Sequence, residues 1–312
     1  MTRALIFPGQ GSQTIGMGKS LAEAFEPAKL VFEEVDDALN QKLSAIMWDG
    51  PEGDLKLTAN TQPALMAHSM AIIRVMEDAG HTVSSIASHV AGHSLGEYSA
   101  LCAAGAFSLV DTARLLKLRG EAMQRAVPVG KGAMAAIIGL EMTAVKSICE
   151  QASEGEIVVP ANDNGGGQIV ISGDKGAVER AADAAKAAGA KRAIILPVSA
   201  PFHCPLMAPA GAEMADALAD TAINAPSVPV IANVIAEPVS DPDHIRSLLV
   251  EQVTGAVRWA ESAAGFAGLG IDCAVEVGTG KVLSGMMRRI DRELTMTNIQ
   301  EPVDLDAFLA SL

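Results

Sequence analysis

The sequence predicts an α/β fold in which a parallel sheet is covered by helices and a smaller second unit is inserted into the chain. Hydrophobic residues make up 49% of the 312 residues and charged residues 19%, which is typical of a chain that buries a large core. Strand-length apolar runs alternate with helix-length amphipathic segments, as in parallel sheets with crossover helices. Between residues 129 and 198 this alternation gives way to a pattern that closes a sheet of its own.

The segments on either side of that insertion predict one large sheet. Helices are expected where apolar residues recur at intervals of three and four, and strands where short apolar runs end at glycine or proline. Before the insertion the pattern predicts strands at 4–7 and 86–92, and helices at 21–39, 62–79, 95–106 and from Ser108 onward. After it, the pattern predicts strands at 228–232 and 273–277 and a C-terminal helix after residue 280.

The insertion has the order strand, helix, two strands, helix, strand. Its predicted elements lie at 133–140, 143–152, on both sides of the glycine-rich segment 164–167, at 177–188 and at 192–198. This split βαβ order is that of a ferredoxin-like unit. We therefore expect residues 129–198 to form a ferredoxin-like small subdomain, and residues 1–128 and 199–312 to form the large catalytic subdomain.

Charge and composition exclude several classes of protein. The chain has 23 basic and 37 acidic residues, and this net charge of -14 opposes binding to nucleic acid. No segment has the length and apolar character of a membrane span or a signal peptide. The cysteines are scattered and form no pair typical of a disulfide framework or metal site: Cys102, Cys149, Cys204 and Cys273. We expect a cytoplasmic protein with reduced thiols, no metal and no membrane contact.

Ser94 is the candidate nucleophile. It lies in Gly92-His93-Ser94-Leu95-Gly96, where glycines on both sides allow a sharp turn from strand to helix that exposes the serine hydroxyl. The pentapeptide alone is weak evidence, but here a predicted strand precedes it and a predicted helix follows it. The free amides of that helix would lie beside Ser94, where an oxyanion would form. The large subdomain is therefore expected to be α/β-hydrolase-like.

His203 is the preferred candidate for the base that activates Ser94. It follows the last strand of the small subdomain, in a loop that Pro201 and Pro205 hold rigid near the point where the large sheet resumes. His244 is the alternative, but its polar surroundings favour a solvated helix start. His93 is expected to point to the opposite side of the strand from Ser94. A buried structural histidine is the other interpretation of His203.

Arg119 is the most informative charged residue. The helix that begins after Ser108, with Ser108 and Asp111 as a capping pair, carries an apolar stripe that includes Leu116, and Arg119 falls on that stripe. A buried guanidinium requires a partner, and a carboxylate of the protein or of a ligand is the expected one. Because Arg119 lies on the helix after the nucleophile turn, a ligand carboxylate is a serious candidate.

Five motifs are spread over essentially the whole chain. They are Phe7-Pro8-Gly9-Gln10-Gly11-Ser12-Gln13, Gly92-His93-Ser94-Leu95-Gly96-Glu97, Leu118-Arg119-Gly120, Pro201-Phe202-His203 and Val257-Arg258-Trp259. In their order and spacing they resemble those of the malonyl-CoA:acyl carrier protein transacylases, the acyltransferase family of bacterial fatty acid synthesis.

The resemblance implies transfer of a malonyl group from malonyl-CoA to the phosphopantetheine thiol of acyl carrier protein through a malonyl-serine intermediate. Ser94 would be the nucleophile and His203 the acid and base. The resemblance further implies backbone amides of Gln10 and Leu95 as the oxyanion hole, Arg119 as the partner of the malonyl carboxylate, and the backbone carbonyl of Gln252 as the group that orients the histidine. It also implies Asn162 as a pocket residue and Phe202 as a bulky residue that favours malonyl over branched acyl groups.

Two alternatives and one surface complete the expectations. A serine esterase or thioesterase of the α/β-hydrolase type would share Ser94 but would leave Arg119 unexplained and should carry an acidic triad residue. A noncatalytic carrier-binding subunit would have lost the nucleophile or base.

No cofactor is expected beyond the coenzyme A thioester substrate, and we expect a monomer. Because carrier proteins are acidic, we expect docking on Lys281, Arg288 and Arg289.

Overall fold

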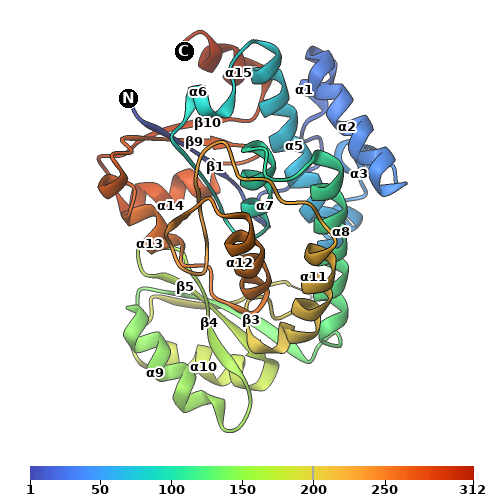
Figure 1. The fold of residues 1–312 in the computed structure, drawn as a ribbon. Helices are drawn as coiled ribbons and strands as arrows, with labels where there is room; N and C mark the ends of the chain where they lie inside the picture. The colour runs from blue at the N-terminus through green and yellow to red at the C-terminus, as the bar shows by residue number, and fades with distance from the viewer. Residues whose placement is uncertain (199) are drawn as a thin grey trace.

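The computed structural model describes residues 1–198 and 200–312, and it contains two separate sheets (Figure 1). The large sheet has the strand order β10-β9-β1-β2-β7-β8. Its strands are parallel except β8, which pairs antiparallel with β7 at one edge. The strands are β1 (Arg3–Phe7), β2 (His89–Gly92), β7 (Val230–Ile231), β8 (Pro238–Val239), β9 (Cys273–Val277) and β10 (Thr295–Ile299).

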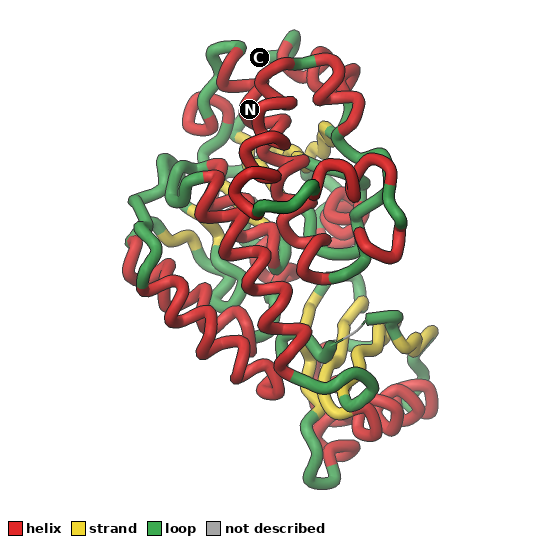
Figure 2. The backbone as a smooth tube through the Cα atoms, turned by 90° about the vertical axis from the view of Figure 1, so that its right-hand side faces the viewer, coloured by secondary structure: helices red, strands yellow, loops and turns green. Residues whose placement is uncertain are grey.

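Helices cover both faces of the large sheet, and both chain ends lie at the end of the molecule away from the small sheet (Figures 1 and 2). The helices outside the insertion are α1 (Lys19–Ala24), α2 (Glu26–Leu39), α3 (Leu43–Asp49), α4 (Glu52–Leu55), α5 (Thr58–Asp78), α6 (Val83–Ile86), α7 (Leu95–Ala103), α8 (Leu109–Ala126), α11 (Ala208–Ala219), α12 (Pro242–Thr254), α13 (Trp259–Ala264), α14 (Val282–Ile290) and α15 (Pro302–Leu309), with short 3-10 turns at Pro205–Met207 and Ala267–Leu269.

Strand alternation divides the interior of the large subdomain into two cores. Leu5 and Phe7 of β1 face the larger core, which is built with α2, α5, α7 and α8. Ala4 and Ile6 face the other side, where α13 and α14 supply Trp259 and several apolar side chains. Because successive side chains of a strand point to opposite faces, one buried strand supplies both cores. The central strand β1 is thereby held rigidly, and the turn that follows β2 rests on it.

The small sheet is antiparallel, with the strand order β4-β5-β3-β6, and two helices lie beneath it (Figures 1 and 2). Its elements are β3 (Gly132–Ile138), α9 (Met142–Ser153), β4 (Val158–Asp163), β5 (Gln168–Asp174), α10 (Lys175–Ala187) and β6 (Arg192–Ile195). One face packs on α9 and α10 through residues such as Ala135 and Ile171. The other face, with Met134 and Val170, joins the large core and borders the cavity described below.

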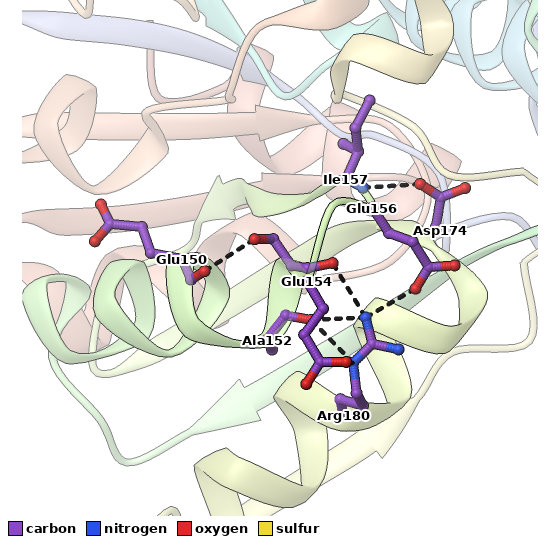
Figure 3. A network of polar contacts seen from close by, with 8 residues as sticks. Glu150, Ala152, Glu154, Glu156, Ile157, Asp174 and Arg180 are labelled. Atoms are coloured by element: carbon purple, nitrogen blue, oxygen red, sulfur yellow. Dashed lines mark hydrogen bonds and ion pairs between the residues drawn. The ribbon is translucent and has the colours of Figure 1, made fainter.

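Arg180 ties the two helices of the small sheet together (Figure 3). From α10 its guanidinium donates to the backbone oxygens of Ala152 and Ser153 at the end of α9, at 2.8–3.1 Å, and it pairs with Glu156 at 2.8 Å. The last carbonyls of a helix lack intrahelical partners, so a cation at this end satisfies them and complements the helix dipole. This contact fixes the outer layer of the small subdomain.

The predicted fold class is confirmed, while some element boundaries were wrong. The helix predicted at 21–39 is two helices that break at Phe25, because Pro27 lies in the first turn of α2, where proline starts a helix rather than continues one. The strand β10 and the helix α15 were not predicted. The proposed start of the returning large subdomain, residue 199, lies outside the described residues. Within those residues, no helix is long and apolar enough to cross a membrane.

Candidate active site

A cavity of about 270 Å³ lies between the large subdomain and the free face of the small sheet. The large subdomain contributes Ser94, Arg119 and His203, which are far apart along the chain. The small sheet contributes an apolar wall, and so do α14 and the loop that follows β6. The lining includes Met134, Ala136, Val170, Leu196, Val198, Phe202, Leu283 and Met286. The arrangement provides a mostly apolar pocket with a few convergent polar groups, as ligand sites do.

The turn that carries Ser94 is tight and strained. Ser94 has φ 54° and ψ −112°, a backbone conformation that residues other than glycine rarely adopt. A Cβ atom at Gly92 would overlap the backbone of Gly96, and one at Gly96 would overlap the Phe7 carbonyl of β1. Glycine is therefore required on both sides of the serine, which confirms the strand–turn–helix arrangement that the pentapeptide predicts.

Asn233 holds the strained turn in place from the loop after β7. Its side-chain oxygen accepts the backbone N–H of Ser94 at 2.8 Å, and its side-chain nitrogen donates to the Gly92 carbonyl at 2.7 Å. The backbone N–H of Asn233 in turn donates to Glu97 at 3.0 Å. These bonds satisfy buried polar groups that the turn itself cannot pair, and so they stabilise its unusual conformation.

Ser94 and His203 form a hydrogen-bonded pair. Ser94 Oγ lies 2.8 Å from His203 Nε2, and His203 Nδ1 lies 2.9 Å from the backbone oxygen of Gln252 and 3.1 Å from that of Gly255. A carbonyl can only accept, so Nδ1 carries the hydrogen and Nε2 is free to accept the serine proton. Among the described residues His203 contacts no carboxylate, in contrast to the triad of the hydrolase alternative.

The electrostatics of the site keep His203 neutral. Burial, and after it the nearby positive charge of Arg119, lower the pKa of His203 to about 3. An unprotonated imidazole is the form that can accept a proton from the serine. The histidine is therefore ready to act as a base across the neutral pH range.

Arg119 lines the cavity and is 1% exposed, as the apolar stripe of α8 predicts. Its Nη1 donates to Gln62 Oε1 at 2.8 Å, and its Nη2 donates to Gln252 Oε1 at 2.9 Å and to Ser94 Oγ at 3.2 Å. Its charged group also lies 5.6 Å from the ring centre of Tyr98. Of the two predicted partners, a carboxylate of the protein is not found within the described chain: its partners are neutral oxygens.

Gln10 and Leu95 both border the cavity. Leu95 is the first residue of α7, so its N–H has no partner within the helix. Neither amide donates to another group within residues 1–198 and 200–312. Unpaired backbone donors in the lining of this cavity can stabilise a negative oxygen that forms on a group attacked by Ser94.

The remaining residues predicted for the pocket also border it. Asn162 of β4 and Phe202, next to His203, both line the cavity, and both are buried. His93 lines it too, which corrects the expectation that it points away: its Nε2 lies 2.9 Å from Asn164 Oδ1. The expectation relied on strand alternation, but β2 ends at Gly92, so the alternation no longer applies at residue 93. His244 is exposed at the first turn of α12, away from this constellation.

The predicted basic patch lies on α14 and just before it. Lys281, Arg288 and Arg289 are all exposed. The same helix lines the cavity through Val282 and Met286 on its other side. Arg289 also donates to Gln168 of the small sheet at 3.0 Å, so the patch borders the cavity where the two subdomains meet. No group of side chains in the described part of the chain could hold a metal ion.

Comparison with known proteins identifies the family. The model of the acyl transferase domain matches residues 4–295. The chain belongs to the acyl transferase family. It is 47% identical over 306 residues to the malonyl CoA-acyl carrier protein transacylase of Escherichia coli strain K12, and the match covers 98% of each protein. The predicted resemblance is thereby confirmed, and the acyltransferase interpretation is supported over the esterase alternative.

Solved structures of the acyl transferase family agree with the fold in detail. The acyl-carrier-protein-S-malonyltransferase of Bartonella henselae superimposes with a TM-score of 0.98 at 56% identity, covering 100% of this chain and 99% of that chain. A type II PKS acyl-carrier protein in complex with its malonyl-transacylase includes a chain that matches with a TM-score of 0.96 at 43% identity, with both chains covered in full.

Sequence reasoning missed three residues of the site: Gln62, Glu97 and Asn233. Gln62 and Asn233 come from segments far from Ser94 along the chain, and nothing local marks them. Glu97 offered one signal, because it ends the motif that contains Ser94, and an acid one helical turn after a nucleophile is placed to face it. Their contacts show that the predicted side chains are held by a second layer of polar groups.

Proposed function

We propose that this protein transfers a malonyl group from malonyl-CoA to the phosphopantetheine thiol of acyl carrier protein, through a malonyl ester on Ser94. One observation carries the proposal: the buried guanidinium of Arg119 lies beside the nucleophile and has only neutral oxygens as partners. A cation in that position requires an anion, and an acyl group with a free carboxylate supplies one. The names of the related proteins point to the same acyl group.

The first half of the reaction acylates the serine. Ser94 Oγ attacks the thioester carbonyl of malonyl-CoA as its proton passes to His203 Nε2, which lies 2.8 Å away. The oxyanion that forms is stabilised by the amides of Gln10 and Leu95. The carbon–sulfur bond then breaks, and His203 returns the proton to the coenzyme A thiolate. Malonyl-serine remains, with its carboxylate on Arg119.

The second half reverses these steps with a different thiol. The carrier's phosphopantetheine thiol gives its proton to His203 and attacks the ester carbonyl. The oxyanion collapses, the bond to Ser94 Oγ breaks, and the serine recovers its proton from His203. In both halves His203 Nε2 passes a proton between the serine oxygen and a thiol, so the histidine needs one orientation only, and the backbone oxygen of Gln252 fixes it at 2.9 Å.

The lining of the pocket accounts for the remaining assignments. Phe202 fills space beside His203, which leaves little room for a branched acyl group, and Asn162 supplies a polar group at the small-sheet wall. No cofactor takes part in this scheme beyond the coenzyme A thioester itself. We also propose that Lys281, Arg288 and Arg289 receive the acidic carrier, since they border the cavity on α14.

The direct test is an assay of the overall reaction. The protein is incubated with malonyl-CoA and holo acyl carrier protein, and the mass of the carrier is measured over time. The proposal predicts malonyl-carrier with wild type and none with Ser94→Ala. A carrier without phosphopantetheine, which lacks the accepting thiol, is the matched control. Release of free malonate at the rate of coenzyme A release, with no acyl-carrier, would instead support a thioesterase.

A further inference from the structure

Glu97 is a buried acid that the proposed reaction does not use. It is 2% exposed and lies in the first turn of α7, three residues after Ser94. Two hydrogen bonds converge on one of its oxygens, Oε2: from the backbone N–H of Asn233 at 3.0 Å and from Gln252 Nε2 at 2.8 Å. Neither donor is a cation, so Glu97 is not held here by an ion pair within the described residues. Its position requires another explanation.

Gln252 connects Glu97 to the site by both ends of its side-chain amide. The nitrogen donates to Glu97 and, at 3.0 Å, to the backbone oxygen of Ser94. The oxygen accepts from Arg119 Nη2 at 2.9 Å. The side chain of Gln252 is fully buried, so no water competes for these groups. The three residues form a chain in which an acid, an amide and a guanidinium follow one another.

The chemistry of this chain permits one orientation of the amide. A carboxylate oxygen accepts and does not donate, whereas a guanidinium donates and does not accept. The amide nitrogen must therefore face Glu97, and the amide oxygen must face Arg119. A flipped amide would place donor against donor at Arg119 and acceptor against acceptor at Glu97, leaving buried polar groups unpaired.

The orientation of Gln252 matters because it fixes one side of the guanidinium. Gln62 holds Nη1 at 2.8 Å, and Gln252 holds Nη2, so two amide oxygens set the plane of Arg119. The Nε of Arg119 is buried with no partner among the described residues. A guanidinium recognises a carboxylate well only when its plane and its edge are correctly placed.

We propose that Glu97 is a positioning residue for recognition of the acyl carboxylate: its Oε2 orients the Gln252 amide, which holds the Arg119 guanidinium beside Ser94. The inference rests on the proposed malonyl transfer, because it explains how the site maintains its preference for an acyl group that carries a carboxylate. Oε2 serves as an acceptor, so what the site requires is an oxygen at that position rather than the negative charge.

Burial supports this distinction between the acceptor and the charge. It raises the pKa of Glu97 to about 7, so that near neutral pH the side chain exists in both protonation states. A proton on Oε1 leaves Oε2 able to accept both bonds. Loss of the charge alone therefore leaves the chain of hydrogen bonds intact.

Two conservative variants separate reach from charge. Glu97→Gln keeps an oxygen at the same reach without the charge, whereas Glu97→Asp keeps the charge but withdraws the oxygen by one methylene. The measurement is the ratio of kcat/KM for acylation of Ser94 by malonyl-CoA to that by acetyl-CoA, from the release of coenzyme A. We expect Glu97→Gln to keep the ratio within about threefold, and Glu97→Asp to lower it by about tenfold or more.

The ratio distinguishes positioning from a general structural role. Glu97 also holds Asn233 and so the nucleophile turn, but damage there lowers both acylation rates together and leaves the ratio unchanged. Gln252→Met keeps the backbone oxygen that orients His203 and removes the amide, so it should lower the ratio as Glu97→Asp does. In the Gln252→Met background Glu97→Asp should cause no further fall, because the two residues act through one chain.

A remote acid provides the matched control. Asp36 is also buried, and its carboxylate accepts from the Ser44 backbone N–H at 2.9 Å and hydroxyl at 2.7 Å, outside the cavity. Asp36→Asn should leave the ratio unchanged. An unchanged ratio in Glu97→Asp, or an equal loss in Glu97→Gln, would overturn the inference. If wild type itself showed no preference for malonyl-CoA, the proposed function would fail instead.

Discussion

Ser94 and Arg119 share a hydrogen bond: Arg119 Nη2 donates to Ser94 Oγ at 3.2 Å. The nucleophile thus lies between a base, His203 Nε2 at 2.8 Å, and a buried cation. The cation favours deprotonation of the serine and, at the same time, disfavours a second positive charge on the histidine. In the proposed reaction a single arginine therefore both prepares the nucleophile pair and binds the acyl carboxylate.

The first prediction concerns the pH dependence of acylation. The pKa of His203 is lowered to about 3, so the base stays neutral as pH falls from 8 to 5. For acetyl-CoA, whose acyl group has no charge, kcat/KM should therefore show no tenfold loss per pH unit below pH 6.5. A loss of that slope would mean that the histidine titrates near its ordinary pKa, against the geometry described above. Pre-steady-state acylation rates measured at constant ionic strength give the profile.

The second prediction concerns stability. Because the pKa of Glu97 is raised from 4.5 to about 7, the folded state binds this proton more tightly than the unfolded state. This contribution to the free energy of unfolding is present below about pH 4.5 and is lost as pH rises to about 7. Glu97→Gln removes the titrating group. Relative to wild type, its free energy of unfolding should therefore rise between pH 5 and pH 8, by at most about 3 kcal/mol.

Denaturant titrations of the two proteins at each pH measure that difference. Using the difference removes the opposite contribution of His203, whose lowered pKa makes stability rise with pH between about 3 and 6.5 in both proteins. A difference that stays constant across this range would show that Glu97 titrates normally in the folded protein.

The third prediction tests the nucleophile turn. Gly92→Ala places a Cβ against the backbone of Gly96, which cannot move aside without displacing the start of α7. We expect a loss of stability of about 3 kcal/mol or more and loss of Ser94 acylation. Gly268→Ala is the control, because a Cβ there meets nothing within 4 Å and the residue is not in a left-handed conformation. Thermal unfolding measures the stability of each variant. An unchanged unfolding temperature together with retained acylation in Gly92→Ala would show that the turn does not require glycine at this position.

The fourth prediction concerns docking of the carrier. Reversing charge at Lys281 and Arg288 should raise the KM for acyl carrier protein several-fold, leave the KM for malonyl-CoA unchanged, and matter less at high salt. Arg289 is kept out of this variant because it also bonds Gln168 at the cavity wall. Charge reversal at Lys29 and Arg114, both outside the cavity lining, matches the change in net charge. Equal changes in the KM for the carrier and for malonyl-CoA would contradict the proposal that this surface docks the carrier.

Local patterns could predict the parts of the site that sequence neighbours define. The glycines around Ser94 predict the turn because the backbone itself requires them, and the apolar stripe of α8 predicts the burial of Arg119. His203 was predicted from its place after the small subdomain and from the motif Pro201-Phe202-His203. Such inferences use features within one element or at one junction.

Relations between distant segments could not be predicted in the same way. The side chains of Gln62, Asn233 and Gln252 meet around Ser94 and Arg119 only because α5, the loop after β7 and α12 converge there. For Gln252 the family resemblance implied a role for the backbone oxygen but not for the side chain. Their side chains are neutral amides, which have no spacing signature. Strand β10 was missed because polar residues such as Thr297 and Asn298 interrupt its apolar pattern, as an edge position permits.

The central claim is that Arg119 makes Ser94 selective for an acyl group with a carboxylate. It is tested by mixing the protein separately with labelled malonyl-CoA and labelled acetyl-CoA, and measuring the label on the Ser94 peptide by mass spectrometry at early times. We predict rapid malonyl labelling in wild type, a loss of about a hundredfold or more in Arg119→Ala, and a smaller change for acetyl. Arg119→Lys keeps the charge without the planar fork of the guanidinium, so its rate of malonyl labelling should lie between those of wild type and Arg119→Ala. Equal losses for the two acyl groups in Arg119→Ala, or wild-type labelling that does not favour malonyl, would contradict the account.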